Sequence, residues 1–99
     1  MTYIQLLKSK VDGKKYTAIF YDEKRSKIKT VHFGAAGMSD FTKHKDEERK
    51  QRYIARHSAN ENWNDYMTAG SLSYHLLWSK PTLSASYNDY IKKFKLKKY

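Results

Sequence analysis

The first third of the chain alternates apolar and polar positions with the period of a β-strand. Three segments show this alternation or the β-branched and aromatic composition of strands: residues 2–10, 15–23 and 27–34. In the second segment Tyr16, Ala18 and Phe20 share one face, which is expected to pack against the core. Asp12-Gly13 marks the first hairpin turn, and the polar run 22–27 marks the second. The pattern predicts a three-stranded antiparallel β-meander.

The rest of the chain follows the period of an α-helix. Asp46 is a good N-cap for a helix that is expected to end near His57. A short helical segment is predicted from Ser71 to Trp78, and Thr82 is expected to cap a last helix. The apolar stripe of that last helix falls at helical spacing: Leu83, Tyr87, Tyr90, Ile91 and Phe94. We expect residues 38–45 to form an irregular connector, since they show neither period.

These elements predict an α+β fold. An N-terminal three-stranded antiparallel β-meander needs its apolar face covered, and two or three C-terminal helices are the natural cover. Residues 1–99 are expected to form a single compact domain with a short basic C-terminal tail at about 92–99. Trp63, Tyr66 and Met67 are expected to anchor a loop to the core, although the tryptophans could also stack on bases.

Composition narrows the class of protein. The chain has 99 residues, of which 39% are hydrophobic and 15% aromatic, enough for one modest core. It contains no cysteine, which excludes disulfides, thiolate catalysis and cysteine-based zinc sites. No apolar run reaches the ~18 residues that a membrane span needs, and the first residues do not resemble a signal peptide.

Charge is the strongest global feature of the sequence. Twenty lysines and arginines face ten acidic residues, which gives a net charge of +10 and a pI near 9.7. Such an excess favours polyanionic partners, either nucleic acid or an anionic membrane surface; the alternative is a basic protein without a specific polyanion. Residues 1–45 and 67–99 carry the excess, whereas residues 46–66 hold four basic and five acidic side chains.

Three groups of cations are candidates for phosphate contacts. Each also has a structural explanation: edge-strand protection for the hairpin lysines, compensation of the helix dipole for the C-terminal ones, and pairing for the helix arginines. For that pairing, Asp46 precedes Lys50 by four residues and Glu48 precedes Arg52 by four. The predicted nucleic-acid-binding residues are Lys14, Lys15, Lys27, Lys29, Arg49, Arg52, Arg56, Lys92, Lys93 and Lys95.

The sequence carries no strong sign of catalysis. We predict no catalytic residue, no metal ligand and no cofactor, because no nucleotide-binding, hydrolase or zinc motif is present. The four histidines do not fall at zinc-ligand spacing. His44 lies between Asp40 and Asp46, a grouping that leaves a metal-dependent nuclease as a weak alternative.

A series of short motifs runs through residues 28–90 in a fixed order: H-F-G, S-D-F-T, H-K-D, R-Y-I-A-R-H, E-N-W and L-W-S-K-P-T-L. In this series the chain resembles an uncharacterised family of small basic proteins from nucleocytoplasmic large DNA viruses of the mimivirus-, chlorella-virus- and marseillevirus-like kinds. The resemblance implies a viral protein found in the virion or in the cytoplasm or nucleus of the infected host cell. It implies no reaction and brings no catalytic residue.

Charge and resemblance together predict a non-enzymatic, nucleic-acid-binding accessory protein of a large DNA virus. Binding is expected to be electrostatic and largely independent of sequence, with DNA favoured over RNA as the partner and no insertion into a membrane. The alternative is a virion-structural or protein-interaction module that forms a homodimer or contacts other virion proteins. The nuclease is the third hypothesis.

Overall fold

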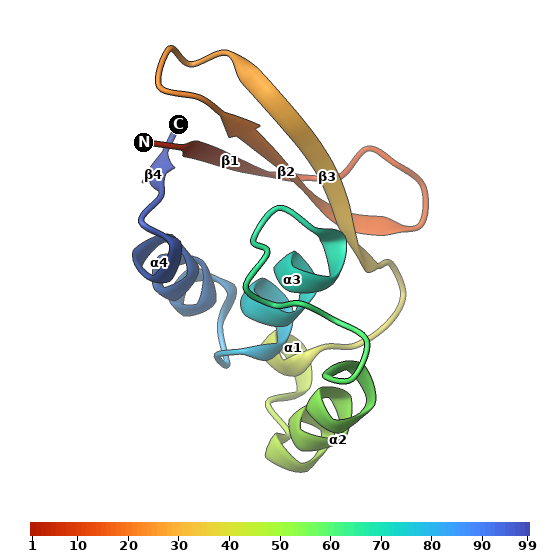
Figure 1. Ribbon diagram of the computed structural model, residues 1–99. Helices are drawn as coiled ribbons and strands as arrows, with labels where there is room; N and C mark the ends of the chain where they lie inside the picture. The colour runs from red at the N-terminus through yellow and green to blue at the C-terminus, as the bar shows by residue number, and fades with distance from the viewer.

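The computed structural model describes residues 1–99. Its elements in chain order are β1 (Tyr3–Lys8), β2 (Lys14–Tyr21), β3 (Lys27–Ala35), α1 (Phe41–His44), α2 (Glu47–His57), α3 (Ala69–Ser73), the π-helical turn η1 (Tyr74–Trp78), α4 (Leu83–Phe94) and β4 (Lys97–Lys98). The strands come early and the helices follow, as Figure 1 shows, so the predicted α+β class is confirmed.

The predicted β-meander is present and forms most of the sheet. β1 pairs with β2, and β2 with β3, both antiparallel. The first hairpin turns at Gly13, whose φ is +82°, as the Asp12-Gly13 pair predicts. Ala18 and Phe20 are fully buried on the core-facing side, together with Phe33 of β3. The alternation along β2 therefore identifies the buried face.

The predicted basic tail is not a free extension of the chain. Its last residues instead add a fourth strand to the edge of the sheet. Lys97 and Lys98 form β4, which pairs in parallel with β1, so the strand order is β3-β2-β1-β4. Leu96 is 6% exposed and belongs to the hydrophobic core. Lys92 and Lys93 are in the last turn of α4, and Lys95 is its left-handed C-cap residue. The apolar Leu96 holds this segment against the protein in spite of the surrounding charge.

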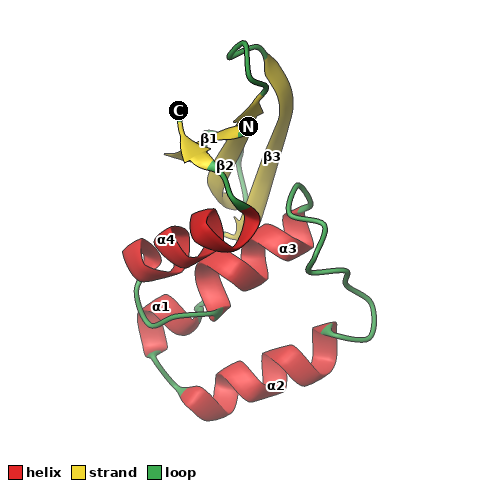
Figure 2. Cartoon of the chain, turned by 60° about the vertical axis from the view of Figure 1, so that its left-hand side comes forward, coloured by secondary structure: helices red, strands yellow, loops and turns green.

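The helices pack mainly on one face of the sheet. Figures 1 and 2 show α3 and α4 next to the strands, with α2 farthest away and the β2–β3 turn projecting at the opposite end. The buried core joins residues from the sheet to Leu72, Leu76 and Leu77 of α3 and η1 and to Tyr90 of α4. The Tyr90 hydroxyl donates a hydrogen bond to the Tyr66 carbonyl at 2.6 Å, which satisfies this polar group inside the core.

The helix boundaries follow the capping residues. Asp46 accepts hydrogen bonds from the backbone amides of Glu48 and Arg49, and α2 ends at His57, as predicted. Thr82 caps α4 in the same way by accepting from the amide of Ala85, which is also as predicted. The connector of residues 38–45 is not irregular throughout, because Asp40 caps the four-residue helix α1. A helix of one turn is too short to show a hydrophobic period.

Candidate functional site

Several of the exposed cations lie at one end of the sheet. Lys27 and Lys97 belong to one row across the four strands, because Lys27 pairs with Tyr21, Tyr21 with Tyr3, and Tyr3 with Lys97. We call the exposed cations at this end the sheet-tip cations: Lys24, Arg25, Lys27, Lys29, Lys95, Lys97 and Lys98. The predicted residues Lys27 and Lys29 on β3 and Lys95 before β4 therefore lie at the same end of the sheet, towards its two opposite edges. Lys92 and Lys93 are exposed in the preceding turn of α4.

The remaining predicted contacts lie elsewhere. Arg49, Arg52 and Arg56, which we call the α2 arginines, are exposed on the helix that lies farthest from the β2–β3 turn (Figure 1). Lys14 is exposed at the start of β2, beside the first hairpin turn. The predicted residues thus do not form one cluster, and the long axis of the molecule measures 42 Å.

Lys15 does not belong with the other predicted contacts. Its side chain is 11% exposed, and its Nζ lies 2.5 Å from Oδ2 of Asp40, whose side chain is 3% exposed. A buried ammonium group needs such a partner, because removing it from water is costly. Its charge is neutralised inside the protein, so the predicted role of Lys15 in contacting phosphate is corrected to a structural one.

The internal pairing considered for α2 is absent. No carboxylate lies within 4.0 Å of any α2 arginine, since the protein's two ion pairs are Lys15 with Asp40 and the N-terminal amine with Glu23. Lys50 does not pair with Asp46 but donates a hydrogen bond to the carbonyl of Ser79 at 2.8 Å. The α2 arginines are therefore free to meet an external anion.

The three residues of the nuclease hypothesis have structural partners. The Asp40 carboxylate binds Lys15 and caps α1, and the Asp46 carboxylate caps α2. His44 Nδ1 accepts a hydrogen bond from the backbone amide of Asp46 at 2.9 Å. The protein has no group of three or more histidine, aspartate or glutamate side chains placed to share a metal ion. The geometry thus supplies no metal site at this position.

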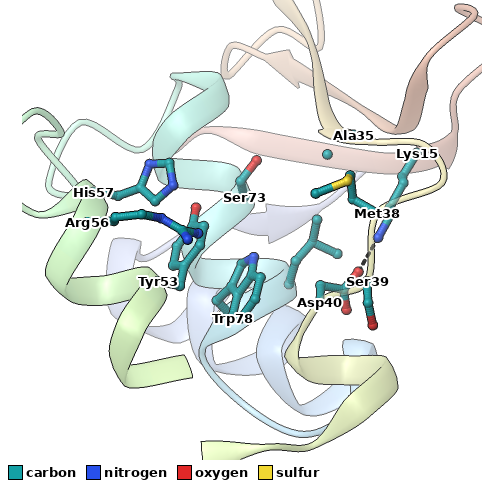
Figure 3. Close-up of a pocket in the computed structure, with 12 residues that line it drawn as sticks. Lys15, Ala35, Met38, Ser39, Asp40, Tyr53, Arg56, His57, Ser73 and Trp78 are labelled. Atoms are coloured by element: carbon teal, nitrogen blue, oxygen red, sulfur yellow. Dashed lines mark hydrogen bonds and ion pairs between the residues drawn. The ribbon is translucent and has the colours of Figure 1, made fainter. Parts of the chain in front are cut away.

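A pocket of about 330 Å³ lies between the end of the sheet, α2 and η1. Figure 3 shows Arg56 and His57 on one side of it, and the Lys15–Asp40 pair on the other. Its twelve lining residues come from four separate stretches of the chain: Lys15; Gly34, Ala35, Met38, Ser39 and Asp40; Tyr53, Arg56 and His57; Ser73, Leu77 and Trp78. Volumes of this size are at the lower end of the range for small-molecule sites.

A column of aromatic rings holds one wall of the pocket in place. Tyr53 of α2 stacks on His57 at 4.3 Å and on Trp78 of η1 at 4.2 Å between ring centroids. Trp78 in turn contacts His44 at 5.3 Å. Tyr53 therefore lies between His57 and Trp78, which occupy its two faces. Trp63, which stacks on Tyr74 at 3.9 Å, likewise anchors a loop.

Burial keeps the Tyr53 hydroxyl protonated. It raises the pKa of Tyr53 to about 12, with a further increase from the negative charge of Glu61 and a partial decrease from Arg56. Tyr53 therefore offers a hydrogen-bond donor at neutral pH.

Gly34 fixes the approach of β3 to η1. Its φ is +78°, and a Cβ atom built on it would lie 2.9 Å from Cδ1 of Leu77. Only glycine combines that backbone conformation with so little space. Nothing in the sequence indicated that β3 borders a pocket at this point.

The profile of a family described as being of unknown function, DUF5754, matches residues 4–57, which is more than half of the chain. The chain belongs to this family. No curated protein and no solved structure matches the sequence significantly. The prediction of an uncharacterised family is thus confirmed, whereas the viral source stays a prediction.

The DUF5754 segment covers β1 to β3, α1 and α2. It contains nine of the twelve pocket residues, while Ser73, Leu77 and Trp78 lie beyond it. The helices of the DUF5754 protein are too short or too polar for any of them to cross a membrane.

Proposed function

We propose that this member of DUF5754 is a non-enzymatic nucleic-acid-binding accessory protein of a large DNA virus, with DNA as the preferred partner. One observation carries the proposal. Of the 20 lysine and arginine side chains, only Lys15 has a carboxylate within 4.0 Å, which leaves 19 without an internal ion-pair partner. Positive charge that is not neutralised within the protein is available to replace the counterions of a polyanion.

The sheet tip supports the proposal through contacts that position its cations. Arg25 lies over the rings of Tyr3 and Tyr99 at 5.0 and 5.7 Å, and Lys98 lies over Tyr87 at 5.3 Å. Such contacts hold a cation close to a ring while leaving its outer side in solvent. A positioned cation loses less conformational entropy when it meets a phosphate than a free one does.

The experiment is a salt titration of binding. Affinities for a labelled DNA duplex and for the same single strand are measured by fluorescence anisotropy between 50 and 200 mM salt. The expected plot of log K against log salt is linear, and its slope equals about −0.9 for each duplex phosphate neutralised. A duplex that fails to bind at 50 mM salt, or an affinity that does not change with salt, would show the proposal to be wrong.

Variants locate the contact surface. K27Q/K29Q and R49Q/R52Q each remove two cations, and each cation that touches a phosphate is expected to reduce the slope by about 1. Q51A is the matched control on α2, since Gln51 is exposed and uncharged. A change at the sheet tip alone would identify that end as the binding surface, and equal slopes in all variants would contradict a defined surface.

The exposed apolar side chains support a second candidate, a homodimeric or virion-structural module. Leu7 and Ile28 are 42% and 49% exposed, and Ile28 is the extra residue where the pairing of β2 and β3 shifts. β3 lies at the edge of the sheet and so has unpaired backbone groups. The molar mass in solution tests this candidate: it requires a stable dimer that DNA does not dissociate.

A further inference from the structure

We propose that the pocket between α2, η1 and the end of the sheet binds a phosphate monoester carried on a nucleoside. This inference goes beyond the proposed function, because a site for one terminal phosphate can exist with or without binding along a nucleic-acid backbone. The argument starts from the hydrogen-bonding groups of the pocket.

Hydrogen-bond donors outnumber free acceptors in the pocket. Arg56, the Tyr53 hydroxyl, the Trp78 indole N–H and the His57 ring face the cavity in Figure 3. The one interaction drawn among all twelve lining residues is the pair of Lys15 with Asp40. These donors thus lack partners among the pocket residues, and a ligand rich in acceptors would satisfy them.

The charge of the pocket points to an anion. Its one carboxylate, Asp40, is neutralised by Lys15, and Arg56 has no carboxylate within 4.0 Å, although the negative charge of Glu61 acts on the neighbouring Tyr53. A guanidinium group with neighbouring hydroxyl and N–H donors matches the oxygens of phosphate, which accept several charge-assisted hydrogen bonds at once. A terminal phosphate offers three oxygens and up to two negative charges, more than a phosphodiester within a strand.

Size and apolar surface indicate what carries the phosphate. The volume of about 330 Å³ exceeds what a phosphate ion needs. Leu77 and Met38 give the pocket an apolar part, and Met38 is 65% exposed at its rim. The flat base of the nucleoside can pack against this apolar part while the phosphate pairs with Arg56. The hydroxyls of Ser39 and Ser73 remain to contact the sugar or the base.

The pocket is preformed, as a binding site for a small ligand usually is. The stack of His57, Tyr53 and Trp78 fixes one wall, and the buried pair of Lys15 with Asp40 fixes the other. The five-residue π-helical turn η1 supplies Leu77 and Trp78. Such turns are rare in proteins and are found frequently at functional sites.

Titrations followed by amide NMR on the full chain test the inference. The probes are adenosine 5′-monophosphate, adenosine, and one short DNA strand with either a 5′-phosphate or a 5′-hydroxyl. We expect the monophosphate to shift the amide signals of Gly34, Ser73 and Trp78, and adenosine to bind at least about tenfold more weakly. The two DNA strands show whether the bound phosphate belongs to a free nucleotide or to the end of a nucleic-acid strand. Only a site that accepts a strand end will bind the 5′-phosphorylated strand more tightly than the 5′-hydroxyl strand.

Matched variants separate the pocket from the general charge of the protein. R56Q removes a pocket cation, and R52Q removes the same charge from the same helix outside the pocket. R56Q is expected to weaken monophosphate binding about tenfold or more, whereas R52Q leaves it within about twofold. Y53F keeps the ring stack and removes one donor, so a smaller loss is expected.

The outcomes keep the two proposals distinguishable. Equal losses in R56Q and R52Q, or no shift of pocket signals at millimolar monophosphate, would overturn the pocket assignment. In that event a salt-dependent duplex affinity would still support the proposed function. Monophosphate binding without duplex binding would support the pocket and remove the proposed function.

Discussion

Lys15 and Arg25 are basic residues at opposite ends of the sheet, and they differ in burial and in ion pairing. Arg25 is exposed in the β2–β3 turn, with its guanidinium over two tyrosine rings and no carboxylate within 4.0 Å. Lys15 is almost buried beside the pocket and is paired with Asp40. One cation contributes to the surface field of the protein, and the other contributes to its stability.

A count of charges along a chain therefore overestimates a binding surface. A lysine contributes to counterion release only where the fold leaves it in solvent. The difference between Lys15 and Arg25 also predicts that substitutions at the two ends of the sheet change the stability of the protein by different amounts. Substitutions at the end of the sheet beside the pocket remove partners from buried groups and are expected to lower the free energy of unfolding strongly. Substitutions at the sheet tip remove contacts that water can replace, so a small effect is expected there.

The largest effect is expected from D40N, which breaks the Lys15 pair at the pocket end. Asparagine preserves the N-cap of α1 but leaves the Lys15 ammonium buried without a counter-charge, at a loss of about 3 kcal/mol in the free energy of unfolding. Urea denaturation measures the change. D46N is the matched control, because Asp46 is an exposed N-cap without an ion pair. Losses of equal size would mean that the pair is not what stabilises this end.

The next effect is expected from G34A, which adds a methyl group where β3 approaches η1. The left-handed backbone and the contact with Leu77 together are expected to lower stability by about 2 kcal/mol. G37A tests the backbone contribution alone, since Gly37 has φ +83° but open space around its Cα, and about 1 kcal/mol is expected there. A smaller loss in G34A than in G37A would contradict the close packing.

Alkaline pH is expected to destabilise the pocket wall through Tyr53. Its folded-state pKa of about 12 exceeds the unfolded value near 10, so the unfolded chain releases this proton first. The stabilising contribution of Tyr53 is complete below pH 10 and is lost as pH rises towards 12. At pH 11 the loss in the free energy of unfolding is about 1 kcal/mol. Denaturation of the wild type and of Y53F, each below pH 10 and at pH 11, measures this loss. The variant should lose less stability than the wild type, and parallel losses would refute the assignment.

The smallest effect is expected at the sheet tip, from Y99A. Tyr99 stacks on Tyr21 at 3.7 Å but is itself 50% exposed, so about 0.5 kcal/mol is expected. Thermal denaturation of Y99A beside D40N gives the direct comparison of the two ends. A loss at the tip as large as that of D40N would remove the contrast between them.

The sequence predicted the local elements well, because each has a local cause. The alternation in β2 identified Ala18 and Phe20 as core residues, and Asp46 and Thr82 marked the starts of α2 and α4. Caps, turns and amphipathic faces depend on residues within a few positions of one another. The helix α1 was missed because one turn leaves no periodic pattern.

The candidate site was predicted only in part. Arg56 is one of the predicted nucleic-acid-binding residues, but its sequence context does not indicate a place in a pocket. Lys15 was grouped with exposed lysines, since no sequence pattern connects it with Asp40, 25 positions later. A pocket built from four separate stretches of the chain leaves no motif at any one of them.

The strands of the meander, the main helices, their buried faces and the total charge can be predicted from the amino-acid sequence, because short-range geometry and composition set all of these. Three features are visible only in the folded protein: Lys97 and Lys98 pair with β1, Lys15 is neutralised, and Arg56 borders a pocket. These features depend on contacts between residues far apart in the chain. The entropy lost in closing such long loops is offset only by the packing of the whole core, so no short stretch of sequence specifies them.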